Sequence, residues 1–262
     1  MSERLGVIEF SKQLIETEDL DPVYVAMYKA NLTRAEVSRF IIGWMCFYHT
    51  GIACMLAKAP RFFDMMCHIT RGGKEYPRGS QRVHHRGPPA IASTEFLQEN
   101  FKSAEELLSW CISDGLAAKV VFNKVCELVG FGPCFAWRIP DIQEAIGLEP
   151  VQFVDRDVDL FYGNPKRGAE ICCEEHGLGK KDVVMKAHLY VMNHLGHMKA
   201  PPMYRRPINV QETETIFCKW KSHIVGRYEV GRDTARARSQ FSFYKLGMCQ
   251  RVLDCMPEGV PQ

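Results

Sequence analysis

Two stretches of this sequence combine side chains that could do acid–base chemistry. In the first, Asp155 to Asp159, carboxylates alternate with other residues. In the second, Glu212 to Lys221, carboxylates and lysines share one predicted helix. A positioned carboxylate can take a proton from a nucleophile, and a neighbouring lysine tunes its pKa. The alternatives are a capped helix N-terminus and surface ion pairs. The catalytic candidates are Asp155, Asp157, Glu212 and Lys219.

A basic, Gly- and Pro-rich segment between Arg71 and Arg86 could hold phosphate. Five basic residues face a single acid, Glu75. Guanidinium groups fork onto phosphate oxygens, so a pyrophosphate clamp on a long loop is one interpretation. A solvated basic loop is the other. The pyrophosphate-binding candidates are Arg71, Arg78 and Arg82, and Lys74 is a candidate for DNA binding.

A predicted helix–turn–helix must position these groups. Apolar residues recur at helical spacing from Leu116 to Leu128. Gly130 and Gly132 then break the helix, and Pro133 suits the first turn of the next one. Glycine N–H groups ahead of a helix can approach a phosphate oxygen closely. We predict that Gly130, Phe131 and Gly132 bind the DNA backbone, with an ordinary αα-hairpin as the alternative.

Other patterns predict a mostly α fold. The capping box Thr33-x-x-Glu36 predicts a helix from about Arg34 to Lys58. Residues 1–30 and Asp182–His197 also have helical patterns. We predict one helical domain over residues 1–262, with the hairpin at about 116–147 and a C-terminal helical segment at about 180–255.

Composition narrows the class of protein. A hydrophobic content of 46% suits a packed core, and a net charge of +2 argues against a polybasic nucleic-acid binder. The 11 cysteines include no C-x-x-C pair, so Cys172, Cys173 and His176 lack the usual spacing of a zinc site. The long apolar stretch at Phe40–Leu56 is interrupted by His49 and Thr50, which favours a buried helix over a membrane span. We expect free thiols, no secretory leader, no membrane association, no metal and no cofactor.

The hairpin residues carry a resemblance to a known superfamily. Val129-Gly130-Phe131-Gly132-Pro133 with Ala136 resembles the hairpin of the helix-hairpin-helix DNA glycosylases. In those enzymes a Val-Asp pair follows about one helix later, and Val154-Asp155 stands at that place. The resemblance implies a glycosylase-like helical fold and a catalytic role for Asp155. Pro133 and Cys134 replace the lysine of the lyases, and the iron–sulfur cysteine cluster is absent, so a lysine-based lyase is not implied.

Further motifs narrow the resemblance. The run Asp155–Gly163, the following Gly163-Asn164-Pro165 and the stretch Glu212–Lys221 resemble bacteriophage α-glutamyl/putrescinyl-thymine pyrophosphorylases and related amino acid:DNA transferases. This resemblance implies a transferase that replaces pyrophosphate on a pyrophosphoryl-oxymethyl-uracil base with an amine. The implied partners are double-stranded DNA carrying modified thymine and a free amino acid or polyamine. The implied location is the cytoplasm of a bacterial host, as for a viral protein.

Two other functions stay open at this point. A helix-hairpin-helix DNA glycosylase would use Asp155 to stabilise developing positive charge at the sugar. A non-catalytic DNA-binding protein would keep the hairpin and form no product. The basic segment and the acids and lysines of Glu212–Lys221 favour the transferase, because hydrolysis of a glycosidic bond leaves no pyrophosphate to hold.

Overall fold

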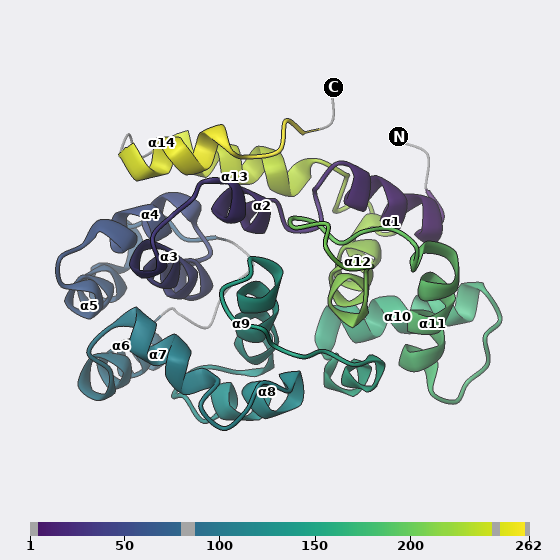
Figure 1. The fold of residues 1–262 in the computed structure, drawn as a ribbon, viewed down its shortest axis with the longest axis horizontal. Coiled ribbons are helices and arrows are strands. Elements are labelled where there is room, and N and C mark those ends of the chain that lie inside the picture. The colour runs from purple at the N-terminus through teal and green to yellow at the C-terminus, as the bar shows by residue number, and fades with distance from the viewer. Residues whose placement is uncertain (1–4, 80–86, 243–246, 260–262) are drawn as a thin grey trace.

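The computed structural model describes residues 5–79, 87–242 and 247–259, most of which lie in helices (Figure 1). The first half contains α1 (Val7–Glu16), α2 (Pro22–Lys29), α3 (Arg34–Phe47), α4 (Thr50–Lys58), α5 (Phe62–Gly72), the 3₁₀ helix η1 (Gly73–Glu75), α6 (Pro88–Asn100) and α7 (Ala104–Cys111). The second half contains α8 (Ala118–Cys126), α9 (Pro133–Ala145), the 3₁₀ helix η2 (Asp155–Leu160), α10 (Gly163–Glu175), α11 (Val183–Leu195), α12 (Val210–His223), α13 (Arg232–Ser242) and α14 (Gly247–Asp254). Within these ranges the only β pairing is two isolated bridges, so the predicted mostly α fold is confirmed.

Two hydrophobic cores organise the helices, one on each side of α9 (Figure 1). The first core joins α2 to α8 with α13 and α14, and we call this part the first lobe. The second joins α1, η2 and α10 to α12, and we call it the second lobe. Helix α9 serves both, because Ile139 faces the first core and Trp137 the second. Polar groups held between the lobes are therefore positioned by two packed bodies.

The predicted helix from Arg34 to Lys58 is wrong, because the chain breaks at Tyr48. The backbone of this residue is left-handed (φ 48°), and its N–H donates the last hydrogen bond of α3, to the carbonyl of Trp44. His49 then begins α4, since its Nδ1 accepts the N–H of Ile52 at 3.3 Å. Burial lowers the pKa of His49 to about 4, so the ring is a neutral cap. The break points Tyr48 toward the space between the lobes. The described part of the predicted helical region, residues 5–30, contains two helices, α1 and α2.

Two helices of the second lobe, α10 and α12, meet at Gly168. A Cβ added to this glycine would lie 2.1 Å from the carbonyl oxygen of Phe217. Backbone at that distance cannot move aside without separating the helices. Gly168 therefore sets the distance between α10 and α12, and both helices line the site described below.

We expect Gly168→Ala to lower the free energy of unfolding by about 1–3 kcal/mol, because the added methyl overpacks a backbone contact. Gly6→Ala is the matched control, since no atom lies within 4 Å of its Cβ position. Chemical denaturation of both variants checks this. Equal stability of the two would show that α10 and α12 can separate freely.

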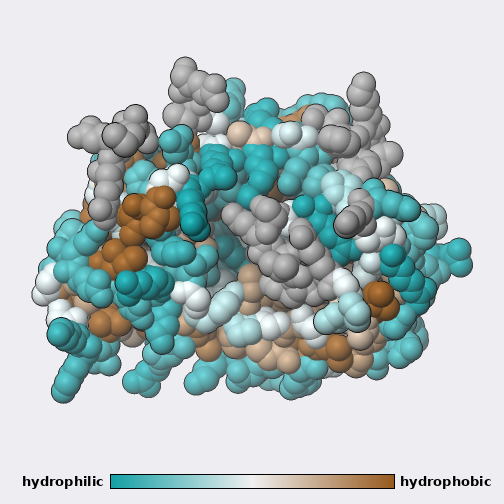
Figure 2. Space-filling model, turned by 180° about the vertical axis from the view of Figure 1, so that it is seen from behind, coloured by the Kyte–Doolittle hydropathy of each residue, from teal (hydrophilic) through white to brown (hydrophobic). Residues whose placement is uncertain are grey.

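The surface of the described residues carries no sign of a membrane segment. None of their helices combines the length and apolarity needed to cross a bilayer. Seen from behind, hydrophilic side chains gather over the upper part of the molecule, and a larger apolar patch lies to one side (Figure 2).

Candidate active site between the lobes

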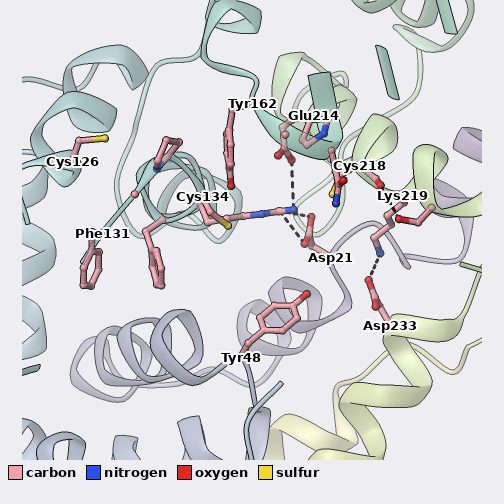
Figure 3. A pocket seen from close by; sticks show the side chains of 18 of the residues that line it. Asp21, Tyr48, Cys126, Phe131, Cys134, Tyr162, Glu214, Cys218, Lys219 and Asp233 are labelled. Carbon is pink, nitrogen blue, oxygen red and sulfur yellow. Dashed lines mark hydrogen bonds and ion pairs between the residues drawn. The ribbon is translucent and has the colours of Figure 1, made fainter. Parts of the chain in front are cut away.

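A cavity of about 930 Å³ lies where the two lobes meet. We call it the interlobe cavity. Its walls are the turn between α8 and α9, the first turn of α10, one face of α12 and the start of α13. Tyr48 and Tyr162 reach into it from opposite sides, with Asp21 between them and Glu214 on the side of Tyr162 (Figure 3). A volume of this size suits a nucleobase together with a small co-substrate.

The predicted helix–turn–helix is present as α8, a tight turn and α9, and the turn lines the interlobe cavity. Gly130 is left-handed (φ 79°), and a Cβ there would meet Ser93 at 2.9 Å. Gly132 differs, because it has an ordinary φ of −88° at the N-cap of α9 and open space around its Cβ position. Phe131 is buried against Phe135, with ring centroids 4.7 Å apart. Gly130 therefore shapes the turn, and Gly132 leaves its surface open. Binding of DNA by this turn stays a prediction.

The two glycines give a matched pair for testing that prediction. We expect Gly132→Leu to fold with less than about 1 kcal/mol of lost stability, because its backbone is ordinary and its surroundings are open. Its Kd for duplex DNA should rise about tenfold or more if backbone N–H groups there contact phosphate. Gly130→Ala should instead lower stability by about 1–3 kcal/mol, through left-handed strain and contact with Ser93. Unchanged DNA affinity in folded Gly132→Leu would refute the role of the turn.

One buried arginine organises the floor of the cavity. Nη1 of Arg138 lies 3.2 Å from Oδ1 of Asp21 and 3.2 Å from Oδ2 of Asp141, and Nη2 lies 3.5 Å from Oε2 of Glu214 (Figure 3). We call these four residues the Arg138 cluster. Burial opposes the charge of Arg138, but Asp21 and Glu214 outweigh it and raise its pKa well above the usual range. The guanidinium therefore stays charged and holds acids from α9, α12 and the start of α2 together.

The three acids of the cluster are not equivalent. Asp141 lies outside the cavity lining, and its Oδ2 accepts the Tyr24 hydroxyl at 2.9 Å. Burial raises the pKa of Asp141 to about 8, against the opposing effect of Arg138. Asp141 thus keeps its proton near neutral pH. Asp21 and Glu214 line the cavity, where a ligand can reach them.

A second buried cation stands beside the first cluster. Nζ of Lys219 donates to the Tyr228 hydroxyl at 2.7 Å, to Oδ2 of Asp233 at 2.7 Å and to the carbonyl of Asp19. The carboxylate of Asp19 in turn accepts the Tyr228 hydroxyl. We call these four residues the Lys219 cluster. Burial works against the ammonium charge, but Asp233 and Asp19 raise the pKa of Lys219. Its three protons all have acceptors, so Lys219 is a fixed positive charge in the cavity wall.

One of the three thiols that line the cavity, that of Cys218, is not set up as a nucleophile. Burial, reinforced by Glu214, raises the pKa of Cys218 to about 12. A thiol needs to be deprotonated in order to attack. Cys218 is therefore a protonated, apolar part of the lining at neutral pH.

The structure does not bring Asp155 or Asp157 to the interlobe cavity. The Asp155 side chain is 64% exposed, and its Oδ1 lies 3.2 Å from Nε2 of buried His188. Burial lowers the pKa of His188, despite the neighbouring carboxylate, so this ring is neutral. Oδ2 of Asp157 accepts the Val154 N–H at 2.8 Å and caps η2, which matches the helix-capping alternative. Catalytic roles for both residues stay predictions without support from their position.

Glu212 also lies outside that cavity and serves the fold. Its carboxylate accepts the Asn209 N–H at 2.7 Å in a capping box, and it pairs with Arg206 at 3.0 Å. Arg206 is shared with Glu144, at 2.8 Å on α9. These contacts join the start of α12 to α9. Among the four catalytic candidates, Lys219 is the one that lines the cavity.

Two of the three predicted pyrophosphate-binding residues, Arg71 and Arg78, are not part of the cavity lining. Arg71 is a surface residue paired with Glu95 at 2.6 Å. Nη2 of Arg78 donates to the carbonyl of Ile69 at 3.1 Å, near the end of α5, and its guanidinium stacks over a Phe47 ring. Arg82 and the side chain of Lys74 lie outside the described part of the molecule. A phosphate-binding role for these residues is untested. Nor do the described residues group three or more His, Cys, Asp or Glu side chains as metal ligands.

The cavity contains functional candidates that the sequence reading missed. These are Asp21, Arg138 and Asp233, whereas Glu214 belongs to the predicted stretch Glu212–Lys221. One signal was available for Arg138, which interrupts the apolar run Phe135–Pro140. An arginine on the buried face of a helix needs carboxylate partners. No comparable signal marks Asp21, because an Asp before a Pro is the ordinary start of a helix.

Parts of the motifs that carried the resemblances line this cavity. They are the hairpin turn, Tyr162 to Pro165, and Glu214, Cys218 and Lys219, whereas Asp155 to Phe161 and Glu212 lie outside it. The chain belongs to the amino acid:DNA transferase family, whose model matches residues 11–229. The protein is therefore a transferase that acts on DNA, as predicted.

Two relatives are similar over most of their length. A glycinyltransferase of Pseudomonas phage PaMx11 is 30% identical, over 98% of this chain and 97% of the relative. A putrescinyltransferase of Delftia phage PhiW-14 is 26% identical, over 87% of this chain and 76% of the relative. One relative is named for an amino acid and the other for a polyamine.

Proposed function

We propose that this protein transfers an amine, from an amino acid or a polyamine, onto a thymine-derived base in double-stranded DNA. The base would carry a pyrophosphoryl-oxymethyl group, and pyrophosphate would be released. The observation that carries the proposal is that the hairpin turn, Tyr162 to Pro165 and the Glu214–Lys219 face of α12 line one cavity. The names of the two phage relatives support amines of both kinds.

The cavity has the features needed for chemistry on a single base. An enzyme reaches an atom of a base in a duplex by extruding the nucleotide into a pocket. The turn at Gly130–Gly132 would hold the backbone beside the extruded nucleotide. Tyr48 and Tyr162, which reach in from opposite lobes (Figure 3), offer aromatic faces to a pyrimidine.

The charges of the cavity suit the departure of pyrophosphate. A leaving group that carries several negative charges departs faster when fixed positive groups face it. Arg138 and Lys219 stay charged but already pair with Asp21, Glu214 and Asp233, so they would act on the pyrophosphate through their electric field and not as hydrogen-bond donors. Helices α9 and α10 also begin at the cavity with their N-termini. Helix N-termini favour anions.

Because the two relatives are phage proteins, the proposed place of action is the cytoplasm of an infected bacterial host.

Mass analysis of nucleosides tests the proposal. Duplex DNA carrying pyrophosphoryl-oxymethyl-uracil is incubated with the protein and a mixture that includes glycine and putrescine. We expect a base with an added amine and one equivalent of pyrophosphate. Abasic sites would identify a DNA glycosylase. DNA binding without any product would identify a non-catalytic binding protein.

The same assay tests the sequence-based role of Asp155. Its exposed position outside the cavity leads us to expect near wild-type turnover from Asp155→Asn. A folded Asp155→Asn variant with turnover lower by about two to four orders of magnitude would restore it as the catalytic carboxylate.

A further inference from the structure

Asp21 holds an unusual position at the start of α2. It is the N-cap residue and precedes Pro22, a combination that normally turns the Asp side chain onto the first helical N–H groups. Here the side chain makes no capping hydrogen bond. It turns instead toward Arg138, whose Nη1 lies 3.2 and 3.3 Å from its two oxygens. Forgoing a cap costs about 1 kcal/mol, so another role has placed this carboxylate in the cavity.

Asp21 is also the carboxylate of the Arg138 cluster that a ligand can best reach. Its side chain is 21% exposed, against 7% for Glu214 and 5% for Asp141. Its neighbours Arg138 and Thr215, which donate to it, hold it in place. An ionised carboxylate offers about four acceptor positions, which leaves capacity for a ligand N–H group.

The other acids near the cavity are less suited to take a proton. Asp141 already holds one near neutral pH and lies outside the lining. Asp233 is held at 2.7 Å on each of its two oxygens, by Lys219 and Arg236, which is closer than the 3.2 and 3.3 Å between Asp21 and Arg138. Glu214 is nearly covered. Asp21 is therefore the acid in the cavity that is best placed to accept a proton.

We propose, on the basis of the proposed function, that Asp21 binds the incoming amine as an ammonium ion and accepts its proton. One N–H proton moves to the carboxylate, and the nitrogen lone pair forms a bond to the methylene carbon of the modified base. The C–O bond to the pyrophosphate breaks, and its electron pair leaves with the pyrophosphate. The new secondary ammonium then loses a proton to solvent, and Asp21 releases its own proton before the next turnover.

Asp21→Asn tests the proposal, because the amide keeps the shape but accepts no proton. With glycine and with putrescine as the varied substrate, kcat/KM for the amine should fall by about 10²- to 10⁴-fold at pH 7. DNA affinity should stay within about twofold. The loss should shrink as the pH is raised toward about 10, where an aliphatic amine loses its proton to solvent.

The pH dependence separates proton transfer from a structural role. If Asp21 only anchors Arg138, the loss will be the same at every pH, and the proposal fails. Asp21→Glu keeps the charge and should recover part of the activity if the variant tolerates the added length. Asp114→Asn, a surface acid paired with Lys124, is the control and should behave as wild type. No adduct from the wild-type protein would instead refute the proposed function, and this inference with it.

Discussion

Arg138→Met is expected to lower the free energy of unfolding by about 3–5 kcal/mol at neutral pH. The reason is that one guanidinium faces Asp21, Asp141 and Glu214 in a buried setting. Removal of one partner leaves buried carboxylates facing each other without a counter-charge, which costs far more than loss of a surface pair. Chemical denaturation gives the value. Arg167→Met is the matched control, because Arg167 is half exposed and pairs on the surface with Glu170, where an ion pair is worth about 0–1 kcal/mol.

The same variant should show a characteristic pH dependence. A buried carboxyl with a raised pKa keeps its proton in the folded state and loses it in the unfolded state, so stability falls as pH rises between the two values. In the wild type this window for Asp141 runs from about 4 to about 8. Without Arg138 the pKa values of its neighbours rise as well. The stability gap between variant and wild type should therefore widen from pH 5 to pH 8, and a gap that narrows with rising pH would contradict this account.

Lys219→Met is expected to have the second large effect, on both stability and turnover. The ammonium donates to Asp19, Tyr228 and Asp233, so methionine leaves three buried acceptors without their donor. We expect a loss of about 3–5 kcal/mol in stability. Among variants still folded at low temperature, turnover should fall by at least about 10²-fold, because a fixed positive charge leaves the cavity wall.

Lys221→Met provides the comparison for that result. Lys221 lies on the same helix, is half-buried and does not line the cavity. Its replacement should change stability by less than about 1 kcal/mol and leave turnover near the wild-type value. If both lysine variants lose activity equally, the effect belongs to α12 as a whole and not to the Lys219 cluster.

Local sequence patterns predicted much of the fold. Two glycines and a proline placed the turn between α8 and α9, because backbone freedom and a fixed φ act within a few residues. A capping box likewise placed the start of α3. The same rules failed at Tyr48, where apolar periodicity continues but tertiary contacts hold a left-handed residue. One such contact is the Gly79 N–H, which donates to the carbonyl of Phe47 at 3.0 Å.

The sequence alone determined the class of fold, the hairpin and the family, because these depend on short-range patterns and on motifs that can be recognised one at a time. Only the tertiary structure decided which side chains share the cavity. Arg138 and Asp21 are 117 residues apart in sequence, and Lys219 and Asp19 are 200 apart. No local pattern links such pairs. They meet because α9 packs between two cores, and because a buried charge is stable only where the fold supplies its partner.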